Sequence, residues 1–259
     1  MKISIIGAGN MGGATARGIA QGTIISTNDI AISNPSKGKL NAIKADFPDI
    51  IVTQDNKECV KDADWVILAV KPWKLQEVID EIRDCLAPGA ILCSMAGGVS
   101  IQKIEEMLND SKRPIYQIIP NTAIAVRQSM TFIASKNSTS EKDQQILDIF
   151  KELGEAMLVE ERLMGAGMAL ASCGIAYAFR YIRAATEGGV ELGLYARDAQ
   201  HIVQQTLKGA VELLEATNGH PEAEIDKVTT PGGITIRGLN AMEQNGFSNS
   251  VIQGLKASK

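Results

Sequence analysis

The chain has 259 residues, of which 45% are hydrophobic and 22% are charged. This composition is typical of a globular protein and excludes a mainly disordered chain, because the apolar residues suffice to bury a core. The formal net charge of −4, without a basic run, argues against nucleic acid as a partner. No apolar stretch approaches the roughly 20 residues of a membrane helix, so we expect no membrane partner.

The first 135 residues alternate β-branched apolar runs with segments of helical spacing. Runs that are continuously apolar, rather than alternating, are typical of strands buried on both faces of a sheet. The runs expected to form strands are Ile3–Ile6, Ile30–Ser33, Trp65–Val70, Ala90–Ser94 and Ile115–Ile119. The segments expected to form helices between them include 11–21, 37–46 and 75–86. This alternation predicts an α/β fold, a doubly wound parallel sheet with helices on both faces.

The character of the sequence changes near residue 135. The short run Ala156–Val159 is expected to close the sheet, and beyond residue 160 strand signals nearly vanish. Two long segments of helical character follow, 163–185 and 197–217. We therefore predict two domains, an α/β domain over residues 1–160 and an all-helical domain over residues 161–259.

Cysteine and histidine form no disulfide or metal pattern. The four cysteines show no paired spacing, so we expect buried free thiols in a reducing compartment and place the protein in the cytoplasm. The first apolar run is also too short to be a secretory signal. The two histidines, His201 and His220, lie far apart, which argues against a zinc site, and we expect no metal.

A glycine-rich turn directly follows the first predicted strand. The motif GxGxxG is formed by Gly7, Ala8, Gly9, Asn10, Met11 and Gly12. In dinucleotide-binding (Rossmann) domains, the first glycine permits the tight turn, the second lets the backbone approach the pyrophosphate, and the third lets the helix pack on the strand. The N–H groups at the start of the following helix then hold the phosphates. Since position, strand and helix agree, we predict that these six residues bind a dinucleotide.

The end of the second strand favours NADPH. An NAD site usually has a carboxylate there, bound to the ribose 2′-hydroxyl, but residues 33–37 include no acid, and Asp29 lies at the wrong end of the strand. Donors in this segment could instead bind a 2′-phosphate. The residues expected to do so are Ser33, Asn34, Ser36 and Lys37. The missing carboxylate permits the phosphate without requiring it, so NADH remains possible.

Three further loops follow predicted strands and should meet at the edge of the sheet where ligands bind. Small residues there would let a nicotinamide ring lie close to the backbone, although each loop by itself could be an ordinary turn. The loops are Ala69-Val70-Lys71-Pro72, Met95-Ala96-Gly97-Gly98 and Pro120-Asn121-Thr122. We expect Asn121 among the residues that bind the cofactor.

A helix-breaking segment stands out in the helical half. Residues 229–235 read Thr-Thr-Pro-Gly-Gly-Ile-Thr, and Pro-Gly-Gly interrupts a helix. Thr235 is then placed to start the next helix, Ile236–Gln244, whose N–H groups are suited to bind a carboxylate. The threonine hydroxyls can add hydrogen bonds. The alternative is an ordinary turn between helices, capped by threonine.

These motifs, together with Gly-Val-Glu-Leu-Gly-Leu at residues 189–194, resemble the pyrroline-5-carboxylate reductase family over nearly the whole chain. The Pro-Gly-Gly-x-Thr segment is the most specific part. The resemblance implies that NADPH reduces the cyclic imine 1-pyrroline-5-carboxylate to L-proline. It also implies a homodimer or higher homo-oligomer with interlocking helical domains, and an active site at the cleft between the domains.

The resemblance also implies roles for single residues. Asn56 would touch the adenosine ribose, and Ala69, Val70, Lys71, Pro72, Met95, Ala96 and Gly97 would line the cofactor. The substrate would bind at Thr230, Gly232, Gly233, Ile234 and Thr235. The backbone of this segment would hold the substrate carboxylate. Thr235 is the expected catalytic residue, because a hydroxyl suffices as a partner of the ring nitrogen if the iminium form binds.

The chain departs from the family in two places. Members usually read Ser-Gly-Ser-Gly-Pro-Ala-Tyr where residues 171–177 read Ala-Ser-Cys-Gly-Ile-Ala-Tyr, so the proline is lost and Cys173 enters the segment. Many members also have Glu where Asn218 precedes Gly-His-Pro. The first difference affects the local helix geometry and the size of the pocket. No role of that glutamate can be transferred to this chain.

Three alternative functions are compatible with this architecture. β-Hydroxyacid dehydrogenases need a lysine on the interdomain helix to move the alcohol proton, and residues 152–207 contain no lysine. Other imine reductases remain an alternative, because a fold can be shared without shared chemistry. A non-catalytic NADPH-sensing protein is the third alternative.

Overall fold

The computed structural model describes all 259 residues, which form two compact units. The first unit comprises Met1–Cys173 together with Lys259, and the second comprises Gly174–Ser258. The sequence prediction placed a domain division after residue 160, inside the first unit. The residues that follow residue 160 pack on the sheet of this unit. Met164 is buried in the core on one face of the sheet, and a Cβ on Gly167 would lie 2.5 Å from the Phe132 ring.

The first unit is built on one eight-stranded sheet of order β3-β2-β1-β4-β5-β6-β7-β8. All neighbouring strands are parallel except β6 and β7, which are antiparallel. The strands are β1 (Ile3–Ile6), β2 (Ile30–Ser33), β3 (Ile51–Thr53), β4 (Trp65–Leu68), β5 (Ile91–Ser94), β6 (Ile115–Ile119), β7 (Ser129–Lys136) and β8 (Gly154–Leu158). The predicted doubly wound parallel sheet is therefore confirmed.

Two strands, β3 and β7, were not among the predicted runs. β3 is only three residues long, and its Ile51 is exposed at the edge of the sheet. β7 includes the polar residues Ser129 and Thr131, which are nevertheless buried. β3 is too short to give a strong strand signal, and in β7 polar residues interrupt the continuous apolar run that marks a buried strand.

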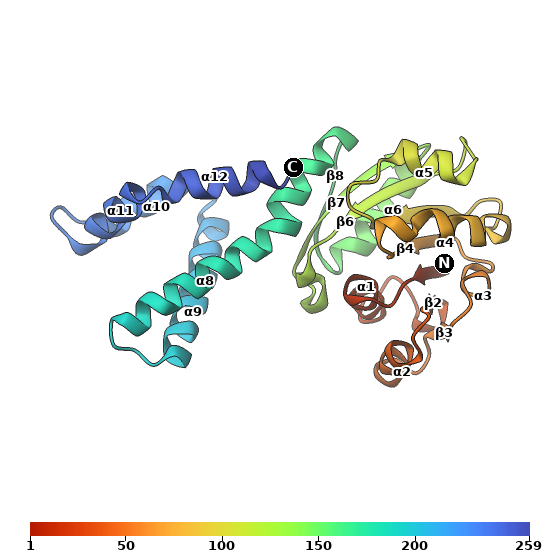
Figure 1. Ribbon diagram of the computed structural model, residues 1–259, viewed down its shortest axis with the longest axis horizontal. Helices are drawn as coiled ribbons and strands as arrows, with labels where there is room; N and C mark the ends of the chain where they lie inside the picture. Colours follow the sequence, from red (N-terminus) through yellow and green to blue (C-terminus); the bar gives the residue numbers. More distant parts are fainter. The chain divides into compact units, whose positions relative to one another are not determined.

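Two layers of helices cover the sheet (Figure 1). Helices α1 (Asn10–Ala20), α2 (Lys37–Asp46) and α6 (Ser140–Lys151) contribute buried side chains to the core on one face. Helices α3 (Asn56–Val60), α4 (Leu75–Ile82) and α5 (Ile101–Leu108) contribute to the core on the other face. Successive residues of β4 alternate between the two cores, as the two-residue period of a strand requires.

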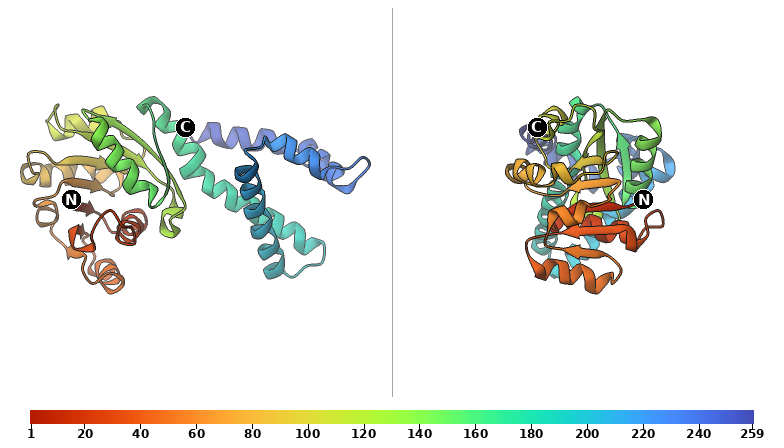
Figure 2. Two further views of the ribbon diagram at one scale, coloured as in Figure 1. Left: turned by 180° about the vertical axis from the view of Figure 1, so that it is seen from behind. Right: turned by 90° about the vertical axis from the view of Figure 1, so that its right-hand side faces the viewer.

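Figure 2 shows the second unit as a run of helices without strands. Its helices are α8 (Gly174–Glu191), α9 (Ala196–Thr217), α10 (Pro221–Val228), α11 (Ile234–Gln244) and α12 (Phe247–Ala257). Helices α8 and α9 approach closely, since a Cβ on Gly189 would lie 2.8 Å from the Ala199 Cβ. Gly193 has a φ of +99° just beyond α8, as expected of a glycine that ends a helix. The Tyr181 and Phe247 rings meet edge to face and join α8 to α12.

The helical run Glu161–Glu191 corrects the expectation that no apolar stretch approaches the length of a membrane helix. It includes an 18-residue window with a mean hydropathy of 1.2, so by length and composition it meets the minimum for a membrane span. Core helices of water-soluble proteins pass the same test, and a single such helix is weak evidence for a membrane protein. The run is also interrupted by a π-helical turn, Met168–Cys173, which includes part of the segment where the chain departs from the resembled family.

Candidate functional site

The turn after β1 requires glycine at two positions. Gly7 has a φ of +105°, and a Cβ on it would lie 2.6 Å from the Ala69 carbonyl oxygen. A Cβ on Gly12 would lie 2.0 Å from the Gly7 carbonyl oxygen and 2.7 Å from the Ala69 Cβ. Helix α1 therefore packs against the end of β1 and the loop after β4 at distances that exclude any side chain. These are the roles that the motif predicts for its first and third glycines.

The N-terminus of α1 is open to an anion. Gly9 is the N-cap, no side chain accepts from the first turn, and that turn contains no acidic residue. A Cβ on Gly9 would meet no atom within 4 Å, so the backbone faces open space. The first N–H groups of a helix have no intrahelical partner and carry partial positive charge. This end of α1 thus fits the pyrophosphate of a dinucleotide.

A cavity of about 760 Å³ begins at this helix end and extends along the carboxyl edge of the sheet. It is lined by most of the residues predicted to bind the cofactor. These are Gly7, Gly9, Asn10, Met11, Asn34, Asn56, Ala69, Val70, Lys71, Pro72, Met95, Ala96 and Gly97. The structure therefore brings together loops that follow several different strands, at the edge where doubly wound sheets bind ligands.

Other predicted residues lie beside this cavity without lining it. Ala8 lines a neighbouring cavity of about 420 Å³ and donates its N–H to Asn34 Oδ1 at 3.0 Å. Gly12 is buried behind the turn. Asn121 is also buried, and its Oδ1 accepts from the Ala123 N–H at 2.9 Å. The Asn121 side chain therefore caps the short helical turn Thr122–Val126.

The predicted 2′-phosphate donors are separated by the structure. Ser33 is fully buried and does not line the cavity. Ser36 and Lys37 are exposed at the start of α2, and neither lines the cavity. Asn34 lines it, but its amide also accepts from the Ala8 N–H and donates to the Ser36 carbonyl at 3.3 Å.

A chain of hydrogen bonds crosses the side of the cavity near the end of β2. Ser33 Oγ donates to Asn56 Oδ1 at 2.7 Å, and Asn56 Nδ2 donates to Glu81 Oε2 at 2.7 Å. Glu81, in α4, thereby brings a carboxylate to the cavity. Because α4 follows β4, no pattern at the end of β2 could have indicated this acid.

Charged residues that sequence reasoning missed also line the cavity. They are Lys39, Lys74, Glu77 and Glu81. Lys74 and Glu77 pair with one another at 2.7 Å. Lys39 also lines the neighbouring cavity. The sequence did contain a signal for Lys39, because residues in the first turn of a helix that follows a parallel strand lie at the edge of the sheet where ligands bind.

In the second unit, the segment between α10 and α11 has the predicted break. Gly232 has a φ of +71°, and the Gly233 N–H donates to the Thr230 carbonyl oxygen at 2.9 Å. Arg237 Nη2 donates to the Gly232 carbonyl oxygen at 2.9 Å, which closes the turn. A Cβ on Gly233 would lie 2.5 Å from Thr230 Oγ1, so this position favours glycine.

Helix α11 begins earlier than predicted. Gly233 is its N-cap, no side chain caps it, and its first turn has no acidic residue. Ile234 and Thr235 therefore lie inside the first turn, whereas the prediction started the helix at Ile236. Thr235 is exposed, as is Ile234 at 83%. As at α1, the free N–H groups of this turn are suited to bind a carboxylate.

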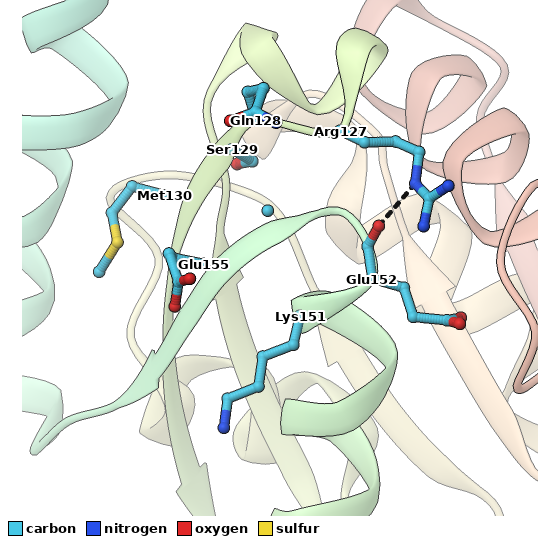
Figure 3. Close-up of a pocket in the computed structure, with 8 residues that line it drawn as sticks. Arg127, Gln128, Ser129, Met130, Lys151, Glu152 and Glu155 are labelled. Atoms are coloured by element: carbon cyan, nitrogen blue, oxygen red, sulfur yellow. Dashed lines mark hydrogen bonds between the residues drawn. The ribbon is translucent and has the colours of Figure 1, made fainter. Parts of the chain in front are cut away.

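A separate hollow of about 570 Å³ lies where β7 and β8 begin (Figure 3). Arg127 Nε donates to the Glu152 carbonyl oxygen at 2.7 Å beside it. Burial would raise the pKa of the Glu152 carboxyl, but hydrogen bonds from the Thr23 hydroxyl and N–H and the Ile24 N–H lower it overall. None of the predicted site residues lines this hollow.

The cysteines are all free thiols, and the chain brings together no group of three or more His, Cys, Asp or Glu side chains that could hold a metal ion. Burial raises the pKa of Cys59 to about 11 and raises that of Cys93 further. Both buried thiols are therefore protonated at neutral pH and unsuited to nucleophilic chemistry. They act as small apolar side chains of the core.

Comparison with known proteins identifies relatives along the whole chain. Residues 161–259 match the family described as "Pyrroline-5-carboxylate reductase dimerisation", and residues 2–98 match "NADP oxidoreductase coenzyme F420-dependent". Pyrroline-5-carboxylate reductase 2 of Dictyostelium discoideum is 37% identical, over 98% of this chain and 89% of that protein. Pyrroline-5-carboxylate reductase of Methanosarcina acetivorans is 34% identical, over 100% of this chain and 97% of that protein.

The fold agrees with these relatives. The crystal structure of Plasmodium falciparum pyrroline carboxylate reductase with NADP bound superposes with a TM-score of 0.91 and 31% identity, covering 100% of this chain and 95% of that one. Identity above 30% and nearly complete coverage on both sides extend the resemblance from single motifs to the whole chain. The chain therefore belongs to the pyrroline-5-carboxylate reductase family.

Proposed function

We propose that this protein catalyses the NAD(P)H-dependent reduction of the cyclic imine 1-pyrroline-5-carboxylate to L-proline. Full-length similarity to proteins of that name carries the proposal. The geometry supports it, because each unit has a helix N-terminus without a side-chain cap or an acid in its first turn. One suits a dinucleotide pyrophosphate and the other suits the carboxylate of a small acid.

The residues around the large cavity fit a nicotinamide dinucleotide. The cradle at Gly9 is open, whereas a Cβ on Gly7 or Gly12 would collide with backbone. The N–H groups at the start of α1 would hold the pyrophosphate, and Asn56 would contact the adenosine ribose. The loops Ala69–Pro72 and Met95–Gly97 would line the nicotinamide side. When bound, the reduced nicotinamide supplies the hydride for the imine carbon.

The substrate carboxylate would bind at the start of α11. The Gly233 N–H is engaged by Thr230, but the N–H groups of Ile234 and Thr235 have no intrahelical partner. Thr230 and the backbone of Gly232 shape the turn that presents them. The positive end of the helix dipole adds to the attraction.

Thr235 is the proposed partner of the ring nitrogen. Its hydroxyl lies on the exposed first turn of α11 and can both donate and accept a hydrogen bond. If the iminium form binds, the nitrogen already has its proton, and the protein has only to orient the ring and exclude water. A strong acid is then unnecessary.

We also propose that the second unit forms a homodimer, or part of a higher homo-oligomer. The description of the family that residues 161–259 match includes the word dimerisation. Large apolar side chains of this unit are exposed on a single chain, among them Phe179, Leu192, Tyr195, Val211 and Leu213. Apolar surface left in water costs about 25 cal/mol per Å², and patches of this kind mark association sites. A cytoplasmic location is proposed with it, on the basis of four cysteines without a disulfide.

The deciding experiment is an assay of the purified protein with 1-pyrroline-5-carboxylate and each reduced nicotinamide, monitored by absorbance. We expect oxidation of the nicotinamide with formation of proline, and no reaction between the oxidised nicotinamide and 3-hydroxy acids. Binding of NADPH without turnover would overturn the proposal in favour of a sensing protein. Oxidation of 3-hydroxy acids would favour the dehydrogenase alternative.

A further inference from the structure

Lys39 lies where two cavities of the first unit meet. It belongs to the first turn of α2, it is exposed, and it lines both the 760 Å³ cavity and the adjacent 420 Å³ cavity. Gly9 and Asn10 line the same two cavities. Lys39 thus belongs to a helix that starts just after β2, and its side chain lines the same cavities as the residues at the N-terminus of α1. Lys37, two residues earlier, lines neither cavity.

The positive charge of Lys39 is not neutralised within the chain. It forms no ion pair, whereas several other charged groups that line these cavities do. Lys74 pairs with Glu77, and Arg17 in the second cavity pairs with Asp46 at 2.7 Å. Glu81 accepts from Asn56. Lys39 is therefore the cation near the end of β2 that lines both cavities and forms no ion pair, whereas Lys71 lines only the larger cavity and follows β4.

Two other donors at the end of β2, Ser33 and Asn34, are already committed. Ser33 is buried and donates to Asn56, and the Asn34 amide bonds with the Ala8 N–H and the Ser36 carbonyl. No carboxylate stands between Ser33 and Lys39 in the sequence. The end of the second strand is where doubly wound domains distinguish a ribose 2′-hydroxyl from a 2′-phosphate. A free cation at this place selects the phosphate.

We propose that Lys39 binds the 2′-phosphate of NADPH and sets the preference of this protein for NADPH over NADH. This inference rests on the proposed use of a nicotinamide dinucleotide and adds the residue that determines its specificity. It replaces Ser36 and Lys37 with Lys39 as the main partner of that phosphate.

The test compares Lys39→Ala with the wild type in direct binding of NADPH and NADH, followed by nicotinamide fluorescence. Loss of one charge-assisted contact should weaken NADPH by about 10- to 100-fold and NADH by less than about twofold. Lys39→Arg should retain most of the preference, because it keeps the charge. Lys112→Ala, which removes an exposed lysine from the turn between α5 and β6, controls for net charge.

A second readout uses adenosine phosphates alone. Adenosine 2′,5′-bisphosphate should compete with NADPH better than adenosine 5′-monophosphate in the wild type, and this advantage should vanish in Lys39→Ala. Equal weakening of NADPH and NADH, or a selective loss in Lys37→Ala that Lys39→Ala does not show, would overturn the assignment. Because these measurements report binding, they remain decisive even if the imine is not turned over, which would contradict only the proposed reaction.

Discussion

Asn56 donates to the Glu81 carboxylate across 2.7 Å and so joins α3 to α4 at the wall of the cofactor cavity. The same amide accepts from the Ser33 hydroxyl, which fixes its orientation from both sides. Asn56 is therefore held by two residues before any ligand binds. Because Asn56 is the proposed contact of the adenosine ribose, we infer that Glu81 is a positioning residue for that contact.

Replacement of Glu81 by Ala should loosen this amide. A single hydrogen bond is worth about 0.5–1.5 kcal/mol, so we expect KM for NADPH to rise about two- to tenfold, with kcat unchanged. Steady-state kinetics with both nicotinamides would measure this. The proposed contact is with the adenosine ribose, which NADPH and NADH share, so KM for NADH should rise as well. An effect on kcat alone would contradict the positioning role.

The two glycines Gly9 and Gly12 should respond differently to the same substitution. Gly9→Ala places its Cβ in open space, so thermal stability should be unchanged while cofactor affinity falls at least about tenfold through loss of close backbone approach. Gly12→Ala drives a Cβ into the Gly7 carbonyl and should lower the free energy of unfolding by about 1–3 kcal/mol. Thermal unfolding and cofactor titration of both variants would test this contrast.

Replacement of Thr235 by Ala should reduce kcat/KM by about 10- to 100-fold, as for one lost hydrogen bond to a reacting group. The dissociation constant of NADPH should barely change, and Thr235→Ser should recover most of the activity. A collapse of cofactor binding in Thr235→Ala would show a structural role instead. Steady-state kinetics paired with fluorescence titration separates these outcomes.

The Glu152 carboxyl predicts a pH-dependent contribution to stability. Its Oε1 accepts from the Thr23 N–H at 2.6 Å and the Thr23 hydroxyl at 2.7 Å, and its pKa is lowered from the ordinary value of 4.5. A lowered folded-state pKa means that this stabilisation is present above pH 4.5 and is lost as the pH falls below it. Glu152→Gln should therefore cost up to about 1 kcal/mol at pH 7, discounted for solvent screening.

The same comparison at acid pH supplies the control for Glu152. Urea unfolding of the wild type and Glu152→Gln should give curves that converge as the pH falls below 4.5 and the carboxylate becomes protonated, because both side chains are then neutral. A difference that stays constant with pH would assign the effect to packing rather than to charge.

Phe179 offers a test of the proposed dimer. The side chain is 60% exposed on α8 of a single chain. If it packs against a second copy, Phe179→Glu should bury an unpaired charge and shift the protein toward monomers. Light scattering after gel filtration would show the change in mass, with Lys112→Ala, which changes the net charge by the same one unit, as a control outside the second unit. A monomeric wild type would contradict the proposal directly.

Local patterns in the chain were enough to specify the class of fold and the position of the uncapped N-terminus of α1. Continuous β-branched runs separated by helical segments specify buried parallel strands. The GxGxxG motif immediately after β1 specifies the tight turn and the start of α1 through short-range sequence alone. Gly7 and Gly12 are needed because a Cβ at either position would collide with neighbouring backbone atoms. The glycines of the motif already indicate this requirement in the sequence. The break at Pro231-Gly232-Gly233 is local for the same reason.

Which side chains share the cavity was settled only by folding. Glu81 reaches Asn56 because α3 and α4 pack on one face of the sheet, and their sequence separation is too large for any local pattern to register the contact. The proposed partner of a 2′-phosphate shifted from Lys37 to Lys39 because α2 directs one lysine to the cavities and the other away from them. Local sequence specifies backbone conformation through short-range sterics, whereas the charge around a ligand is summed over elements that only folding brings together.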